Sequence, residues 1–372
     1  MTEPPAPDPS ATEPPARDPL AVVLPAGIDD PAAPSGGNRY DRRVCDGLAT
    51  RHDLHEIAVA GAWPQPAPAH RGALRRALAG LPDGMPVLLD GLVAGGVPEV
   101  LEAEASRLRL ITLVHLPLGD ETGLEAATAT RLHRLEGRAL HACAAVVTTS
   151  AAAAERVTGL HGLPATRVHV APPGSDRAAA AVPSPRGARL LCVAAVTHRK
   201  GQDVLVDALS TMDDLDWVCR CVGATDREPA FAAALRGRHP RVTFAGTRAG
   251  AELDRTYAEA DLLVLPSRAE TYGMVVTEAL ARGVPVLGSD VTGVREALGD
   301  GGGLVPPGDP GALAAALRRW LTDEGLRTAW RGAAARRRAA LPGWDATVRA
   351  LDDVISPPPT PPPAAEEEHH GR

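Results

Sequence analysis

Two glutamates, Glu270 and Glu278, stand with seven residues between them, where a polar loop leads into a predicted helix. The start of a helix presents free backbone N–H groups and the positive end of its dipole, so this junction favours an anion. Glu278 lies inside the helix, and helical side chains lean back toward the N-terminus, so both carboxylates can face one ligand. Carboxylates accept hydrogen bonds from hydroxyl groups. The pattern therefore favours a ligand that combines a diphosphate with sugar hydroxyl groups, which is a nucleotide sugar.

The elements around these glutamates form one strand–loop–helix–strand unit. Residues 261–265 read D-L-L-V-L and predict a buried strand, and residues 274–282 predict a helix that ends at Gly283. The same alternation runs along the chain and is typical of doubly wound parallel sheets. Further strands are predicted at 21–24, 54–60, 86–90, 108–114, 144–148, 168–171, 189–196, 216–222, 242–245 and 285–288. Helices are predicted between them, among others at 36–50, 121–142, 310–322, 325–340 and 344–355.

The alternation is interrupted once, by a stretch rich in Ala, Pro, Ser and Arg. We therefore expect an N-terminal Rossmann-like domain at 19–176, a linker at 177–187, and a C-terminal Rossmann-like domain at 188–340. A terminal helix at 341–356 follows. Residues 1–18 and 357–372 are rich in Pro and acidic residues and are predicted to be disordered tails.

The composition excludes several classes of protein. A net charge of −7 argues against a nucleic-acid binder that neutralises phosphates. No apolar run reaches the roughly 18 residues of a membrane span, and the N-terminus lacks a basic and apolar signal sequence, so we expect a cytoplasmic chain. The five cysteines are odd in number and form no C-x-x-C pair, which favours reduced thiols over disulfides or zinc. No metal site is expected, because the D-x-D at 214–216 precedes a strand and is interpreted as a turn.

The stretch around the two glutamates resembles a known signature. Glu270 and Glu278, the intervening T-Y-G-M-V-V and the following A-L-A-R-G-V-P-V resemble the donor-binding motif of retaining family 4 glycosyltransferases of GT-B fold. The resemblance covers roughly residues 20–356. It implies two Rossmann-like domains with a cleft between them and a C-terminal helix that crosses back to the first domain. It also implies that Glu270 contacts the donor sugar and Glu278 the ribose.

Other candidate residues follow from the resemblance. Gly36 and Gly37, after the first strand, would let the backbone approach the donor diphosphate. His115, at the carboxyl end of a predicted strand, would touch the donor sugar. Phe244 lies in the loop expected beside the nucleobase. The donor would also meet the loop and helix start formed by Tyr272, Gly273, Met274 and Val275.

Lys200 is the one lysine among 39 Lys and Arg residues. In the family, this lysine and an arginine five residues earlier neutralise the donor diphosphate, and here the earlier position holds Ala195. Arg199 or His198 could substitute for the missing arginine.

The resemblance implies metal-independent, retaining transfer of a hexose-type sugar, without a cofactor, to a small-molecule, glycan or lipid-linked acceptor. A basic helix face with Arg131, Arg134 and Arg138 could meet an anionic acceptor or membrane lipid, although a solvated face is favoured. Two alternatives stay open. One is a GT-B sugar-nucleotide epimerase or phosphorylase. The other is a non-catalytic sugar-nucleotide-binding protein, which the Ala195 departure favours.

Overall fold

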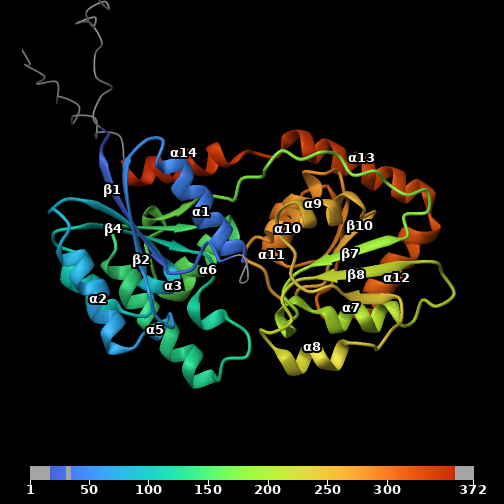
Figure 1. Ribbon diagram of the computed structural model, residues 1–372, viewed down its shortest axis with the longest axis horizontal. Helices are drawn as coiled ribbons and strands as arrows, with labels where there is room; N and C mark the ends of the chain where they lie inside the picture. The colour runs from blue at the N-terminus through green and yellow to red at the C-terminus, as the bar shows by residue number, and fades with distance from the viewer. Residues whose placement is uncertain (1–16, 31–34, 357–372) are drawn as a thin grey trace, which may run out of the picture.

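The computed structural model describes residues 17–30 and 35–356. Within these residues the chain forms two α/β units that lie side by side, each built on a six-stranded parallel sheet (Figure 1). The predicted tails, apart from Arg17 and Asp18, lie outside the described residues.

The first unit alternates strands and helices as predicted. Its strands are β1 (Pro19–Pro25), β2 (Asp53–Val59), β3 (Pro86–Asp90), β4 (Arg109–Val114), β5 (Ala145–Thr148) and β6 (Val168–Val170). Its helices are α1 (Gly36–Leu48), α2 (Pro68–Ala79), α3 (Gly91–Ala94), α4 (Pro98–Glu104), α5 (Ala126–Ala142) and α6 (Ala151–His161). The strand order is β2-β1-β3-β4-β5-β6, so the chain changes direction across the sheet between β1 and β3.

The second unit also alternates strands and helices, but its strand order is different. Its strands are β7 (Arg189–Val193), β8 (Val218–Val222), β9 (Val242–Phe244), β10 (Leu262–Leu265), β11 (Val286–Ser289) and β12 (Gly302–Val305). Its helices are α7 (Gln202–Leu209), α8 (Pro229–Leu235), α9 (Gly250–Ala258), α10 (Met274–Leu280), α11 (Thr292–Leu298), α12 (Pro310–Thr322) and α13 (Glu324–Ala340). The order is β12-β11-β10-β7-β8-β9, and the direction changes between β7 and β10.

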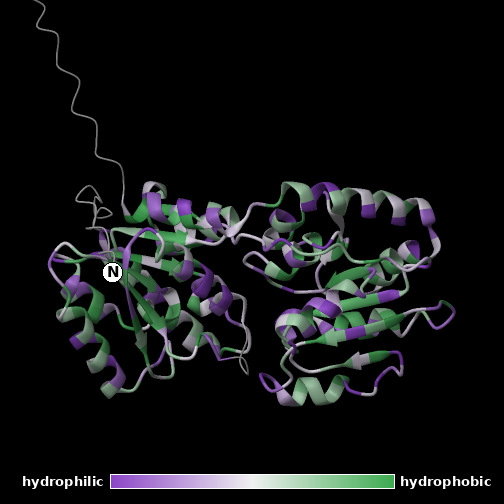
Figure 2. Ribbon diagram, turned by 45° about the horizontal axis from the view of Figure 1, so that its top comes forward, coloured by the Kyte–Doolittle hydropathy of each residue, from purple (hydrophilic) through white to green (hydrophobic). Residues whose placement is uncertain are grey.

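Burial explains the composition of the strands. Helices cover both faces of the central strands, so β10 is a continuous apolar run in which every residue is buried. The edge strand β2, D-L-H-E-I-A-V, instead mixes charged and apolar residues and is mostly exposed. Figure 2 shows the same contrast between hydrophobic central strands and the more hydrophilic periphery.

The last helix, α14 (Trp344–Ile355), returns to the first unit as predicted (Figure 1). Its apolar positions recur at helical spacing, and Val348 and Leu351 are buried in the same core cluster as α1 residues. Gly47 of α1 makes this approach possible, because a Cβ there would lie 2.3 Å from Cγ2 of Val348.

The structure departs from the predicted elements most clearly at one helix start and at one strand. The helix predicted from residue 121 begins at Ala126, and a short 3-10 turn at Leu118–Asp120 precedes it. The sequence analysis also missed β12. This strand reads G-G-L-V, and its glycines give neither the alternation nor the β-branched content that signals a strand. A Cβ at Gly302 would lie 1.8 Å from the carbonyl oxygen of Val286, so the neighbouring strand β11 leaves no room for a side chain.

Candidate functional site

The two sheets bring their carboxyl-end loops to the same part of the molecule, where the first unit meets the second. In open α/β sheets, ligands bind where the strand order reverses. In the second sheet, the loops after β7 and β10 flank that point, and they carry Lys200 and Glu270. In the first sheet, the loop after β1 leads to Gly36 and Gly37, and Asp90 ends β3.

Lys200 and Glu270 form the most buried cation–carboxylate contact of this region. The Lys200 Nζ lies 2.5 Å from Oε1 of Glu270, and Ser267 Oγ donates to the same oxygen at 2.8 Å. Arg199 Nη1 lies 3.8 Å from the other oxygen, Oε2. Burial alone would raise the pKa of Glu270, but the charges of Lys200 and Arg199 and the hydrogen bonds of Lys200 and Ser267 hold that pKa below its usual range. Two cations thus flank Glu270, and Arg199 also pairs with the half-exposed Glu121 of the first unit at 3.3 Å, so an anionic ligand that replaces Glu121 would meet the second positive charge.

A glycine makes this contact possible. Gly201 follows Lys200 with φ +70°, a left-handed conformation that favours glycine. A Cβ at Gly201 would lie 2.1 Å from the carbonyl oxygen of Pro266. Only glycine therefore lets the loop after β7 approach the loop after β10, which places Lys200 beside Glu270.

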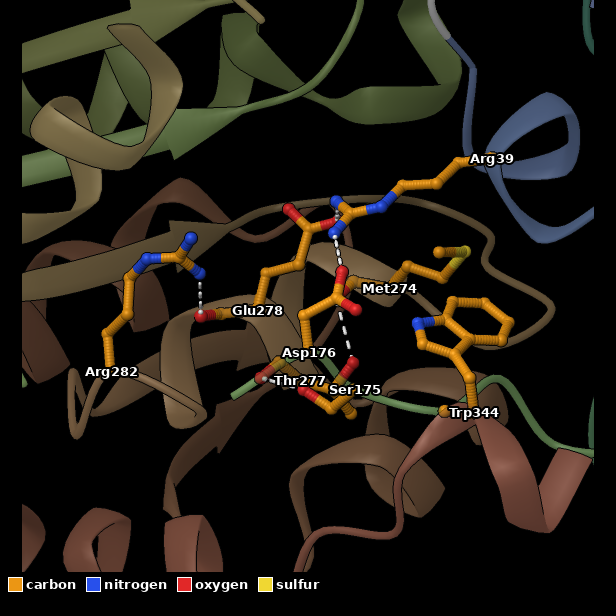
Figure 3. Close-up of a pocket in the computed structure, with 9 residues that line it drawn as sticks. Arg39, Ser175, Asp176, Met274, Thr277, Glu278, Arg282 and Trp344 are labelled. Atoms are coloured by element: carbon orange, nitrogen blue, oxygen red, sulfur yellow. Dashed lines mark hydrogen bonds and ion pairs between the residues drawn. The ribbon is translucent and has the colours of Figure 1, made fainter. Parts of the chain in front are cut away.

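Glu278 lies elsewhere in the cleft and has other partners. Figure 3 shows it on α10 facing Arg39, which comes from α1 of the first unit. Arg39 donates to Glu278 Oε1 at 2.6 Å and to Asp176 at 2.7 Å, and the Tyr257 hydroxyl donates to Glu278 Oε2 at 2.8 Å. The cavity between these groups, lined also by Trp344, holds about 10 Å³. No residue in the described ranges bonds both Glu270 and Glu278.

The loop and the start of α10, which lie between the two glutamates, are partly buried in the hydrophobic core. Tyr272 is buried in the apolar cluster of the second unit. Gly273 has φ +82° and precedes α10. Met274 packs against the cores of both units, with its sulfur 3.5 Å from where a Cβ of Gly36 would lie. Val275 is partly buried against the same cluster as Tyr272.

The two remaining donor-binding candidates differ in their surroundings. Phe244, at the end of β9, packs against apolar clusters and is partly buried. Arg199 reaches Glu270, whereas His198 packs against Phe231, with ring centroids 4.0 Å apart and the planes tilted by 35°, and bonds Glu228. Of the two residues considered as substitutes for the missing arginine at Ala195, Arg199 is therefore the one beside Glu270.

His115 follows β4 and lies against Gly37 in the first unit. A Cβ at Gly37 would lie 3.5 Å from the imidazole Cδ2. The His115 Nε2 lies 2.8 Å from Oδ1 of Asp41 and 3.7 Å from Oδ2 of Asp90. Ligand atoms of Asp41, Asp90 and His115 lie within 4.8 Å of one another, and they make up the one group in the described part of the chain with metal-ligand geometry. The Nε2 of His115 is hydrogen-bonded to Asp41.

The sequence analysis missed Arg39, Asp41 and Asp90. Asp90 ends a predicted strand at the sheet edge where ligands gather, so its position was a signal. Arg39 and Asp41 follow the glycine pair within the first turns of α1. Their roles depend on contacts between distant segments, which a single sequence does not reveal.

Among the residues that the structure describes, no helix is both long and apolar enough to span a membrane.

Two Rossmann-like units with a crossing C-terminal helix define the GT-B fold, which confirms the predicted fold. Solved structures support this assignment. The sucrose-phosphate synthase of Thermosynechococcus elongatus is 22% identical, with a TM-score of 0.70 over 91% of this chain and 98% of that one. Anabaena HepE in complex with UDP and glucose is 15% identical, with a TM-score of 0.72 over 91% of this chain and 99% of that one.

Sequence comparisons give the family. Residues 187–323 match the family described as glycosyl transferases group 1. The chain is 30% identical to D-inositol 3-phosphate glycosyltransferase 1 of Catenulispora acidiphila, over 83% of this chain and 80% of that protein. A D-inositol 3-phosphate glycosyltransferase of Xylanimonas cellulosilytica is 32% identical, over 59% of this chain and 58% of the relative. The chain belongs to the group 1 glycosyltransferases of family 4.

Proposed function

We propose that the protein transfers a hexose-type sugar, with retention of configuration, from a nucleotide-diphospho-sugar to an acceptor bound against the first unit. The observation that carries this proposal is the cluster of Lys200, Arg199 and Glu270 at the point where the second sheet reverses. A carboxylate that two cations keep charged can accept hydrogen bonds from sugar hydroxyl groups, while the cations stabilise the diphosphate leaving group.

Arg199 supplies the second cation, in place of the arginine that the family has at the position of Ala195. Its guanidinium reaches both Glu270 and Glu121 of the first unit, with Nε 3.3 Å from Glu121 Oε1. When the diphosphate binds, Arg199 exchanges this exposed carboxylate for phosphate oxygens. This assignment favours an active enzyme over a non-catalytic sugar-nucleotide binder.

Charge neutralisation by side chains makes the proposed transfer metal-independent. We expect activity to survive EDTA, measured as sugar transferred per unit time before and after chelation. Activity that vanishes with EDTA and returns with Mg²⁺ or Mn²⁺ would contradict this part of the proposal. Retention is checked by the anomeric coupling constant of the product in NMR spectra.

The acceptor is proposed from the relatives. Because the first relatives are named for D-inositol 3-phosphate, this phosphorylated polyol is the first acceptor to test. An uncharged polyol of the same shape, myo-inositol, is its matched control. Transfer to the phosphorylated form alone supports an anionic acceptor.

The deciding experiment has two stages. A thermal-shift screen against nucleotide sugars identifies the donor, because a ligand that binds only the folded state raises Tm. Transfer is then measured with that donor for the unmodified protein and for Lys200→Ala, Glu270→Gln and a control, Arg220→Ala. Arg220 is a half-exposed cation on β8 that pairs with Glu259, away from the cluster.

We expect both cluster variants to lose transfer while Arg220→Ala keeps it. Epimerised free nucleotide sugar without transfer would favour the epimerase alternative. Full activity of Lys200→Ala and Glu270→Gln would overturn the proposed site.

A further inference from the structure

The turn after β4 brings an acidic residue of the first unit to the candidate site of the second. This short 3-10 turn, Leu118–Asp120, is followed directly by Glu121, whose Oε1 lies 3.3 Å from Nε of Arg199. The Thr122 N–H donates to the same oxygen at 3.0 Å. The Glu121 side chain is 50% exposed, so a ligand in the cleft can reach its carboxylate.

Two helices of the first unit hold this turn in place. Glu136 of α5 is 1% exposed and accepts a hydrogen bond from the Leu118 N–H at 3.1 Å. Asp120 accepts two hydrogen bonds from Arg156 of α6, at 2.7 and 2.9 Å. The backbone that presents Glu121 is therefore fixed by contacts within the first unit, and these contacts do not depend on the second unit.

The ion pair with Arg199 is a weak reason for such support, because water screens exposed ion pairs and they contribute little to stability. In the proposed function the donor diphosphate takes Arg199, which leaves the Glu121 carboxylate facing the cleft from the first unit. Transfer needs the acceptor hydroxyl beside the leaving diphosphate, in contact with the anomeric carbon. A carboxylate has two acceptor oxygens and can bind two neighbouring hydroxyl groups.

We propose that Glu121 is an acceptor-binding residue. Its carboxylate accepts hydrogen bonds from neighbouring hydroxyl groups of a polyol or sugar acceptor. This inference rests on the proposed function and extends it to the acceptor. Arg199 binds the Glu121 carboxylate in the free protein and releases it when the donor diphosphate binds.

Glu121→Gln tests the role, because it keeps the size of the side chain and replaces one acceptor oxygen by an amide NH₂. Transfer is measured with the donor found in the thermal-shift screen and with D-inositol 3-phosphate, myo-inositol and D-glucose as acceptor probes. We expect the acceptor KM to rise by about tenfold, through the loss of one hydrogen bond to a charged group, while the donor KM does not rise. Glu125→Gln is the matched control, because Glu125 is exposed at the start of α5 and makes no capping hydrogen bond.

Acceptor binding separates this role from the contact between the units and needs no turnover. The acceptor Kd is measured by isothermal titration calorimetry with and without the nucleoside diphosphate of the donor. In the unmodified protein we expect tighter acceptor binding when the nucleotide is present, because Arg199 has then released Glu121. Arg199→Ala should remove this dependence on nucleotide. Glu121→Gln should weaken acceptor binding whether or not Arg199→Ala is present.

Three results would count against these conclusions in different ways. An acceptor KM of Glu121→Gln equal to that of Glu125→Gln would overturn the proposal. So would an effect of Glu121→Gln on acceptor Kd that disappears with Arg199→Ala, since Glu121 would then be only a contact between the units. Donor hydrolysis by water without transfer to any polyol or sugar would overturn the proposed acceptor class. Absence of both hydrolysis and transfer with every nucleotide sugar would instead overturn the proposed function, so the failures are distinguishable.

Discussion

Replacing Arg39 by alanine tests whether the first unit competes with the donor for Glu278. If Glu278 binds the ribose, the carboxylate oxygens of Glu278 must accept hydrogen bonds from ribose hydroxyl groups. In the structure both oxygens already have partners, Arg39 and Tyr257, and the cavity of about 10 Å³ has room for about one water molecule. A ribose therefore has to displace Arg39.

The exposure of the Arg39 side chain sets the size of the expected change in donor affinity. Hydrogen bonds to charged groups contribute roughly 1.5–3 kcal/mol when well shielded. Because the Arg39 side chain is 38% exposed, solvent screening reduces this to about 1 kcal/mol. Removing Arg39 should therefore tighten donor binding by about fivefold. The assay is the donor Kd by isothermal titration calorimetry.

Arg43 provides a matched control on the same helix. It binds Asp176 at 2.8 Å, as Arg39 does, but makes no contact with Glu278. Arg43→Ala should leave the donor Kd unchanged. Arg39→Ala should also have no effect when Glu278→Gln is present. Weaker donor binding in Arg39→Ala alone would refute the reasoning and make Arg39 a donor contact.

Three further predictions concern the loop, a helix contact and pH. Lys200→Arg should fold normally but lower kcat by about 10²-fold, because a planar guanidinium cannot occupy the place of a compact ammonium beside Gly201; a kcat near that of the unmodified protein would contradict this. Gly47→Ala should lower the unfolding free energy by about 1–3 kcal/mol through the clash with Val348. Gly72→Ala on α2 should not, because a Cβ there would meet only Nη1 of Arg76, at 3.6 Å, as urea denaturation would show. The pKa of Glu270 is lower in the folded state than its unfolded value of 4.5. The ionised carboxylate therefore stabilises the fold above pH 4.5, and this contribution is lost as pH falls through the folded pKa. The Tm of Glu270→Gln should lack this acid dependence.

The fold was predictable because its signals are local. Apolar runs such as 261–265 mark buried strands, and Gly283 marks the end of a helix. The spacing of Trp344, Val348 and Leu351 gives α14 its apolar face, and only the family resemblance said which unit that face covers. The strand β12 escaped prediction because its glycines are selected by the close approach of β11, a tertiary cause without a local pattern.

The site was predictable where a motif carries it, and not where packing does. The sequence singled out Lys200 and Glu270, and the structure places them in contact, while their roles stay predictions. Ala195 could be recognised as a departure from the family, but only coordinates show that Arg199 rather than His198 lies beside Glu270. The carboxylates around His115 come from α1 and β3, so nothing in the spacing of the sequence associates them.

The contacts between the two units use the same segments as the candidate site. Ser150 Oγ of the first unit donates to the carbonyl oxygen of Thr271 at 2.6 Å, next to Glu270. Glu121 and Arg39 of the first unit bind Arg199 and Glu278 of the second unit, respectively. A ligand that takes Arg199 and Glu278 away from these partners alters the contacts between the units at the same time. Donor affinity and the arrangement of the two units are therefore linked, and a variant that weakens a contact between the units should change donor affinity without touching the donor.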